Sequence, residues 1–206
     1  MALTLKDRIR AERVAARRSV PETVRRAEGR ALAEHLVALV SDDEIVAAYA
    51  PLETEPGYPD LPGILLDLRV RVLLPVARTS DDGTPLPLRW AEYRRAGLVA
   101  APFGLLEPSG PWLAPAALAS AGTVFVPALA VDRHGARLGR GAGFYDRSLS
   151  FRDPGARLIA VVRDDELVDE LPAEPHDVPM THALTPARGL VTLSRPGNAA
   201  FPLALE

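Results

Sequence analysis

The feature that most constrains the fold is a series of short apolar runs separated by helical patterns. The runs are too short for helices and are rich in Val, Ile and Leu, as in strands buried on both faces of a sheet. They cover residues 45–49, 70–74, 123–126 and 157–162. A helix is expected over 60–68, and a further strand over 86–90 after the turn 80–83. This alternation predicts an α/β fold with three layers (α/β/α) and a largely parallel sheet.

Two helices are predicted before the first strand. Thr4 has the position of an N-cap, with Asp7 three residues later, and the helix runs to about Arg18. The sequence Ser19-Val20-Pro21-Glu22 repeats this pattern and opens a second helix, whose apolar residues keep helical spacing as far as Leu39. We therefore predict a single domain over 1–206 in which residues 1–40 form an N-terminal helical arm.

Composition excludes several classes of protein. The chain has no cysteine, which rules out disulfides and thiolate metal sites. No apolar stretch reaches about 18 residues, so no membrane partner is expected. The N-terminus lacks the apolar run of a signal peptide, and we expect a cytoplasmic protein. The sequence does not decide the oligomeric state, and a monomer is the working expectation.

The net charge of −3 conceals a basic N-terminal segment. Residues 1–30 hold nine basic side chains and four acidic ones. The segment has no aromatic residue that could stack on a base, and the acidic remainder of the chain would repel a polyanion. We therefore expect no nucleic-acid partner. Among the 24 basic residues only Lys6 is a lysine, and the others are arginines. A lysine at this position is either a coincidence or has a role that requires a compact ammonium group rather than a planar guanidinium.

The glycine-rich segment 137–147 carries the strongest functional pattern. It reads Arg137-Leu138-Gly139-Arg140-Gly141-Ala142-Gly143-Phe144-Tyr145-Asp146-Arg147. Alternate glycines allow several backbone N–H groups to converge on an anion, and a helix starting near Phe144 would point its N-terminus there. The spacing matches neither a Rossmann fingerprint nor a P-loop. A flexible turn is the alternative, but the flanking arginines favour a phosphate site. Asp146 could bind Mg²⁺ there, or its negative charge could only interact favourably with the positive end of the helix dipole.

Together with four other segments, this stretch resembles the 5-formyltetrahydrofolate cyclo-ligase family, also called 5,10-methenyltetrahydrofolate synthetase. The other segments are Lys6-Asp7-Arg8-Ile9-Arg10, the run 45–49 leading to Glu55, Phe103-Gly104-Leu105-Leu106-Glu107-Pro108, and His176-Asp177 shortly before Thr185. The likeness implies a ligase with folate and ATP as small-molecule substrates and Mg²⁺ as cofactor. It would convert 5-formyltetrahydrofolate to 5,10-methenyltetrahydrofolate and release ADP and phosphate. The formyl oxygen would be phosphorylated, and N10 would attack the activated carbon.

The resemblance also implies roles for individual residues. The chemical step would rely on Arg140 and Lys6, and Mg²⁺ would bind Asp146 and Asp177. The residues implied to bind ATP are Lys6, Arg10, Arg137, Leu138, Gly139, Arg140, Gly141, Ala142, Gly143, Phe144 and Tyr145. Those implied to bind the folate are Ala50, Glu55, Phe103, Arg140, Gly141, Ala142, Gly143 and Phe144.

Two departures from the family pattern leave the activity open. Ala142 stands where glycine or a cation is often found, and Thr181 stands where an aspartate commonly follows Asp177 by four residues. One alternative is therefore a nucleotide-binding regulatory paralogue without turnover. The other is an enzyme like the sugar-phosphate isomerases or CoA-transferases. It would need a catalytic glutamate at a strand end, and Glu55 lies too close to a loop proline to fit that role.

Overall fold

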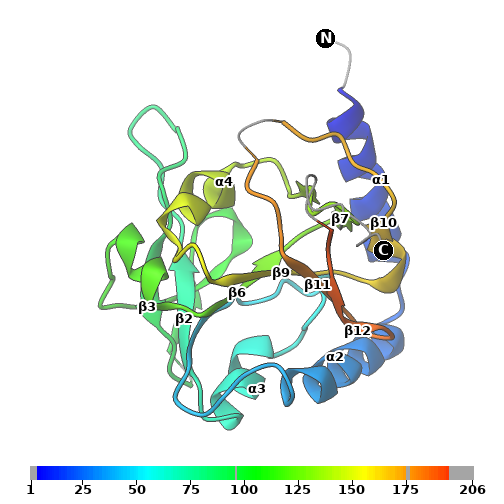
Figure 1. Cartoon of the computed structure of the whole chain (residues 1–206). Coiled ribbons are helices and arrows are strands. Elements are labelled where there is room, and N and C mark those ends of the chain that lie inside the picture. Colours follow the sequence, from blue (N-terminus) through cyan, green and yellow to red (C-terminus); the bar gives the residue numbers. More distant parts are fainter. Residues whose placement is uncertain (1–3, 96, 175–176, 195–206) are drawn as a thin grey trace, which may run out of the picture.

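The computed structural model describes residues 4–95, 97–174 and 177–194, and a seven-stranded sheet forms its centre (Figure 1). From edge to edge the strands are β12 (Gly189–Thr192), β11 (His182–Thr185), β9 (Arg157–Val161), β6 (Thr123–Pro127), β1 (Ile45–Ala47), β2 (Arg71–Val76) and β3 (Arg89–Glu92). The five inner strands are parallel, whereas β12 and β3 pair antiparallel with their neighbours. The predicted largely parallel sheet is confirmed.

Helices cover both faces of this sheet (Figure 1). On one face lie α2 (Glu22–Leu36) and α3 (Leu61–Asp67), and on the other lie η2 (Pro115–Ser120), α4 (Phe144–Ser148) and η3 (Leu149–Phe151). Successive residues of a strand point to opposite faces, so Val46 packs with Leu32 of α2 while Ala47 packs with Leu118 of η2. The two buried cores follow from this alternation and give the predicted three layers.

The first helix, α1 (Leu5–Ser19), lies beside a second sheet of three short strands. These are β10 (Leu167–Val168), β7 (Ala130–Asp132) and β8 (Arg137–Leu138). The predicted cap is present: Asp7 N donates to Thr4 Oγ1 at 3.1 Å, and Thr4 N donates to Asp7 Oδ2 at 3.2 Å. Ile9 packs against Ala130. Both predicted helices are therefore confirmed, and both pack on the body of the domain.

Some predicted boundaries were wrong for local reasons. The strand expected over 86–90 begins at Arg89, because Pro87 has no N–H to donate to a strand ladder. The second helix ends at Leu36, after which Leu39 N bonds to Leu36 O in a tighter turn. Residues 98–108 contain three short elements that were not predicted: β4 (Leu98–Ala100), η1 (Pro102–Gly104) and β5 (Leu106–Pro108), which pairs with β4. Over the described part of the chain, no helix combines the length and apolar character needed to cross a bilayer.

Candidate active site

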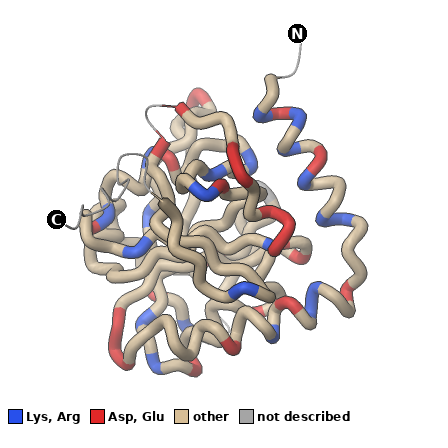
Figure 2. Tube along the Cα trace, turned by 45° about the vertical axis from the view of Figure 1, so that its right-hand side comes forward, with Lys and Arg blue, Asp and Glu red and all other residues tan. Residues whose placement is uncertain are grey.

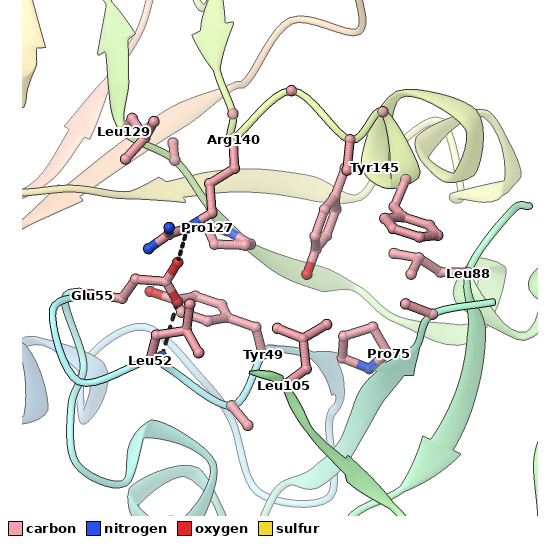
Figure 3. A pocket seen from close by; sticks show the side chains of 18 of the residues that line it. Tyr49, Leu52, Glu55, Pro75, Leu88, Leu105, Pro127, Leu129, Arg140 and Tyr145 are labelled. Atoms are coloured by element: carbon pink, nitrogen blue, oxygen red, sulfur yellow. Dashed lines mark hydrogen bonds and ion pairs between the residues drawn. The ribbon is translucent and has the colours of Figure 1, made fainter. Parts of the chain in front are cut away.

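A cavity of about 350 Å³ opens where the strands β1, β2 and β6 end (Figure 3). Tyr49 and Ala50 follow β1, Ala77 follows β2 and Ala128 follows β6, and all four residues line it. The carboxyl edge of a parallel sheet is the usual position for ligand sites in α/β folds. The glycine-rich segment forms the opposite wall, and α1 contributes Arg10 and Arg17.

Helix α1 lies directly on the glycine-rich segment. Arg10 Nε donates to the carbonyl oxygen of Gly139 at 3.1 Å, and a Cβ on Gly141 would lie 3.4 Å from Arg10 Cζ. Gly141 and Gly143 have φ values of 97° and 76°, a region that side chains disfavour. The alternating glycines therefore permit both this close approach and the turn that leads into α4.

An ion pair joins two walls of the cavity (Figure 3). Arg140 Nε lies 3.0 Å from Oε1 of Glu55, and Oε2 of Glu55 accepts a 3.0 Å hydrogen bond from Leu52 N. The Glu55 side chain is 9% exposed, whereas that of Arg140 is 43% exposed. A nearly buried carboxylate is thus held at the cavity wall by a partner that is itself partly exposed to solvent.

Asp146 lies at the edge of the same cavity and is paired with Arg137. Arg137 Nη2 contacts one of its carboxylate oxygens, Oδ1, at 2.5 Å, and the guanidinium lies 5.7 Å from the ring of Tyr145. Over residues 4–95, 97–174 and 177–194 there is no cluster of three acidic or histidine side chains that could hold a metal by itself. Mg²⁺ on a nucleotide requires only one or two carboxylates, because phosphate and water oxygens complete its six ligands. Asp146, within the glycine-rich segment and on the cavity lining, fits that lesser requirement.

Lys6 and Asp177 meet each other outside this cavity. Lys6 Nζ lies 2.9 Å from Glu174 Oε1 and 3.3 Å from Asp177 Oδ2. Partial burial opposes the charge of the ammonium, but the hydrogen bonds and charges of the two acids outweigh it and raise the pKa of Lys6. Although Lys6 and Arg10 share a helix face, Arg10 reaches the glycine-rich segment whereas Lys6 reaches Glu174 and Asp177.

Most of the residues predicted for the site line the cavity. They are Arg10, Ala50, Glu55, Arg137, Gly139, Arg140, Gly141, Ala142, Gly143, Phe144, Tyr145 and Asp146. Lys6 and Asp177 are not in its lining, and neither is Leu138, which is buried against Ala130 and Leu171. Phe103 belongs to η1, but its side chain and the whole of His176 lie outside the described residues.

Arg17 and Glu107 also line the cavity, although neither was among the predicted site residues. Arg17 lies two turns after Arg10 on the same helix face, a spacing that could have indicated it. Glu107 is buried at the cavity, where its carboxylate accepts from Ala77 N at 2.6 Å and pairs with Arg78 at 2.7 Å. It belongs to the segment 103–108 that carried part of the family resemblance.

Thr181, one of the two departures from the family pattern, has a structural contact. Its hydroxyl oxygen accepts from Leu158 N at 2.9 Å and lies 3.0 Å from Leu158 O, to which it donates. These bonds tie the start of β11 to β9, so the threonine supports the sheet at this point.

Comparisons with known proteins agree with this architecture. A sequence model of the 5-formyltetrahydrofolate cyclo-ligase family matches residues 3–186. A 5-formyltetrahydrofolate cyclo-ligase from Mycolicibacterium smegmatis is 56% identical over 188 residues, which cover 91% of this chain and 97% of that protein. The protein of the same name from Escherichia coli K12 is 31% identical over 57% of this chain and 64% of its own length.

Two solved structures share the fold. The 5,10-methenyltetrahydrofolate synthetase of Aquifex aeolicus has a TM-score of 0.73 at 23% identity, over 98% of this chain and all of that one. The synthetase of Mycoplasma pneumoniae has a TM-score of 0.65 at 19% identity, over 86% and 96% of the two chains. The chain is therefore a ligase of the 5-formyltetrahydrofolate cyclo-ligase family.

Proposed function

We propose that this enzyme converts 5-formyltetrahydrofolate and ATP to 5,10-methenyltetrahydrofolate, ADP and phosphate. The observation that carries the proposal is the convergence of three distant segments on one cavity. Helix α1 contributes Arg10, the loop after β1 contributes Glu55, and the glycine-rich segment contributes Arg140. Such a site offers cations and backbone N–H groups for phosphates beside a carboxylate for a heterocycle.

We assign the nucleotide to the side of the glycine-rich segment. Backbone N–H groups from Gly139 to Gly143 can face phosphate oxygens, with Arg10 and Arg137 close by. Asp146 would hold Mg²⁺, and on the family resemblance we assign Asp177, which lies outside the cavity lining, as a second ligand. A bound Mg²⁺ would supply charge neutralisation for the phosphates.

We assign the folate head group to the side of Glu55. A carboxylate is a suitable acceptor for the adjacent N–H donors of a pterin, and Pro75, Leu105 and Phe144 provide apolar wall for its ring. Because Arg140 holds Oε1 of Glu55, a pterin that takes this oxygen would displace the guanidinium. Arg140 would then be free to turn toward the phosphates.

The chemistry needs positioning and charge rather than a protein nucleophile. The formyl oxygen attacks the γ-phosphorus of ATP, and the bond to ADP breaks. N10 then adds to the formyl carbon, N10 loses its proton, and phosphate leaves to complete the 5,10-methenyl bridge. We assign the neutralisation of charge on the transferred phosphoryl group to Arg140, which lines the cavity, and on the family resemblance to Lys6, which lies outside its lining. Alignment of the reactants by the two halves of the cavity supplies the remaining rate enhancement.

The test is ADP release with and without 5-formyltetrahydrofolate, followed together with methenyl absorbance. Folate-stimulated ADP release with an equal amount of methenyl product is the expected result. ATP binding without turnover would instead favour a regulatory paralogue. Turnover of a sugar phosphate or acyl-CoA, with no response to the folate, would favour the isomerase or transferase alternative.

A further inference from the structure

The two tyrosines that line the cavity differ in what their hydroxyl groups contact. The Tyr49 hydroxyl donates to the carbonyl oxygen of Pro56 at 2.8 Å. The Tyr145 hydroxyl oxygen is buried and has no hydrogen-bond partner among the described residues. A buried hydroxyl without a partner has lost its hydrogen bonds to water and forms none within the protein, so it lowers the stability of the ligand-free protein.

Packing alone does not require this hydroxyl. Tyr145 stands in α4 next to Phe144, and both rings pack against the buried core on that face of the sheet. A phenylalanine at position 145 would fill the same space without an unpaired polar atom. The hydroxyl group is therefore best explained by a partner that enters the cavity.

The hydroxyl points away from the glycine-rich segment and into the middle of the cavity, toward Tyr49 and Leu105 (Figure 3). Burial raises the pKa of Tyr145 well above its usual value; Arg137 opposes this change and the charge of Glu55 adds to it. The group consequently stays protonated and available as a donor over the physiological pH range.

We infer that the Tyr145 hydroxyl donates a hydrogen bond to a carbonyl oxygen of the folate head group. This inference rests on the proposed function. If Glu55 accepts from the N–H groups of the pterin, the carbonyl oxygens left as acceptors on the ring system are its 4-oxo oxygen and the formyl oxygen on N5. These oxygens are neighbours on one edge of the ring system, so a single donor can reach either. Tyr145, which the family resemblance assigned to ATP binding alone, is then also a folate-recognition residue.

The test compares the variants Tyr145→Phe and Tyr49→Phe with the parent enzyme, using calorimetric titration and thermal unfolding. Tyr145→Phe is expected to leave the ligand-free unfolding temperature unchanged or raise it. Its Kd for 5-formyltetrahydrofolate should rise about three- to tenfold, the effect of one neutral hydrogen bond, while its Kd for ATP stays the same. Tyr49→Phe is the matched control: it loses the bond to Pro56, so its ligand-free unfolding temperature should fall.

Titration with tetrahydrofolate, which lacks the formyl group, identifies the acceptor. Weaker binding of both folates by Tyr145→Phe supports the 4-oxo oxygen, and weaker binding of the formyl compound alone supports the formyl oxygen. Unchanged affinity for both folates, or a loss confined to ATP, overturns the inference while leaving the proposed function intact. A parent enzyme that binds no folate overturns both.

Discussion

Arg17 and Glu166 form a two-point ion pair that fastens α1 to the body of the enzyme. Arg17 Nε and Nη2 each lie 2.7 Å from an oxygen of Glu166, and both side chains are only 2% exposed. Arg17 Nη2 also donates to the carbonyl oxygen of Ala128 at the cavity. Figure 2 shows charges of both signs along this helix. The basic N-terminal segment thus serves in part as an anchor, since Arg13 and Arg17 both bind residues 165–166.

Glu166→Gln should lower the free energy of unfolding by about 3–5 kcal/mol, because it leaves the Arg17 charge buried and uncompensated. Urea denaturation measures this change. The control is Glu92→Gln, which removes one partner of the exposed pair between Arg71 and Glu92 and should cost about 1 kcal/mol or less. Equal effects of the two substitutions would show that burial does not govern the strength of these pairs.

Glu55→Gln should weaken binding of 5-formyltetrahydrofolate about tenfold or more and spare ATP, because an amide cannot accept from two pterin N–H donors as a carboxylate does. Calorimetric titration with each ligand provides the measurement. Glu53→Gln, in the same loop but exposed and paired with Arg25, is the control. Normal folate affinity of the Glu55 variant would refute the assignment of this residue.

Lys6→Ala should raise the KM for ATP about tenfold or more without unfolding the protein, because the ammonium is only partly buried and lies away from the central sheet. Steady-state kinetics with ATP varied, together with a melting curve, test both parts. Arg8→Ala removes an exposed cation from the same helix and should leave the KM unchanged. An unaltered KM in the Lys6 variant would exclude its proposed role.

Asp146→Asn should shift the Mg²⁺ requirement to concentrations several-fold higher, since a neutral amide is a poorer ligand for a hard cation than a carboxylate. Activity is measured against Mg²⁺ at saturating ATP and folate. Asp169→Asn, at an exposed position paired with Arg133, controls for the loss of one negative charge. Superimposable Mg²⁺ curves for the parent and the Asp146 variant would rule out metal binding by this side chain.

Unfolding at alkaline pH should depend on the buried tyrosines. Burial, followed by the charge of Glu55, raises the pKa of Tyr49, and burial also raises that of Tyr145. Above about pH 10 the unfolded chain loses these protons while the folded chain retains them. The unfolding free energy should therefore be unaffected by these groups below pH 10. Above it, each tyrosine should lower that energy by roughly 1.4 kcal/mol per pH unit. Urea midpoints between pH 8 and 11 measure the slope, and Tyr145→Phe should reduce it. An unchanged slope would contradict the prediction.

Features that depend on residues close together in the chain could be predicted from the sequence. The apolar runs predicted four of the five inner strands, β1, β2, β6 and β9, because each of their faces meets a helical layer, whereas β11 was not predicted. The cap of Thr4 and Asp7 predicted the start of α1, because both partners lie within one turn. The short strands β7, β8 and β10 carry no such pattern, since strands of two or three residues are too brief for a period to appear.

The assembly of the site was decided only by the tertiary structure. Lys6 and Arg10 lie one turn apart on the same helix, yet one meets Asp177 and the other meets Gly139. The contacts of Glu55 with Arg140, and of Arg17 with Glu166, join residues 85 and 149 positions apart. Local periodicity holds no information about such pairs, because they form only when the packing of the sheet and its helices brings distant backbones together. Whether the Tyr145 hydroxyl has a hydrogen-bond partner also depends on the residues that surround it in the folded cavity, so the sequence could not predict it.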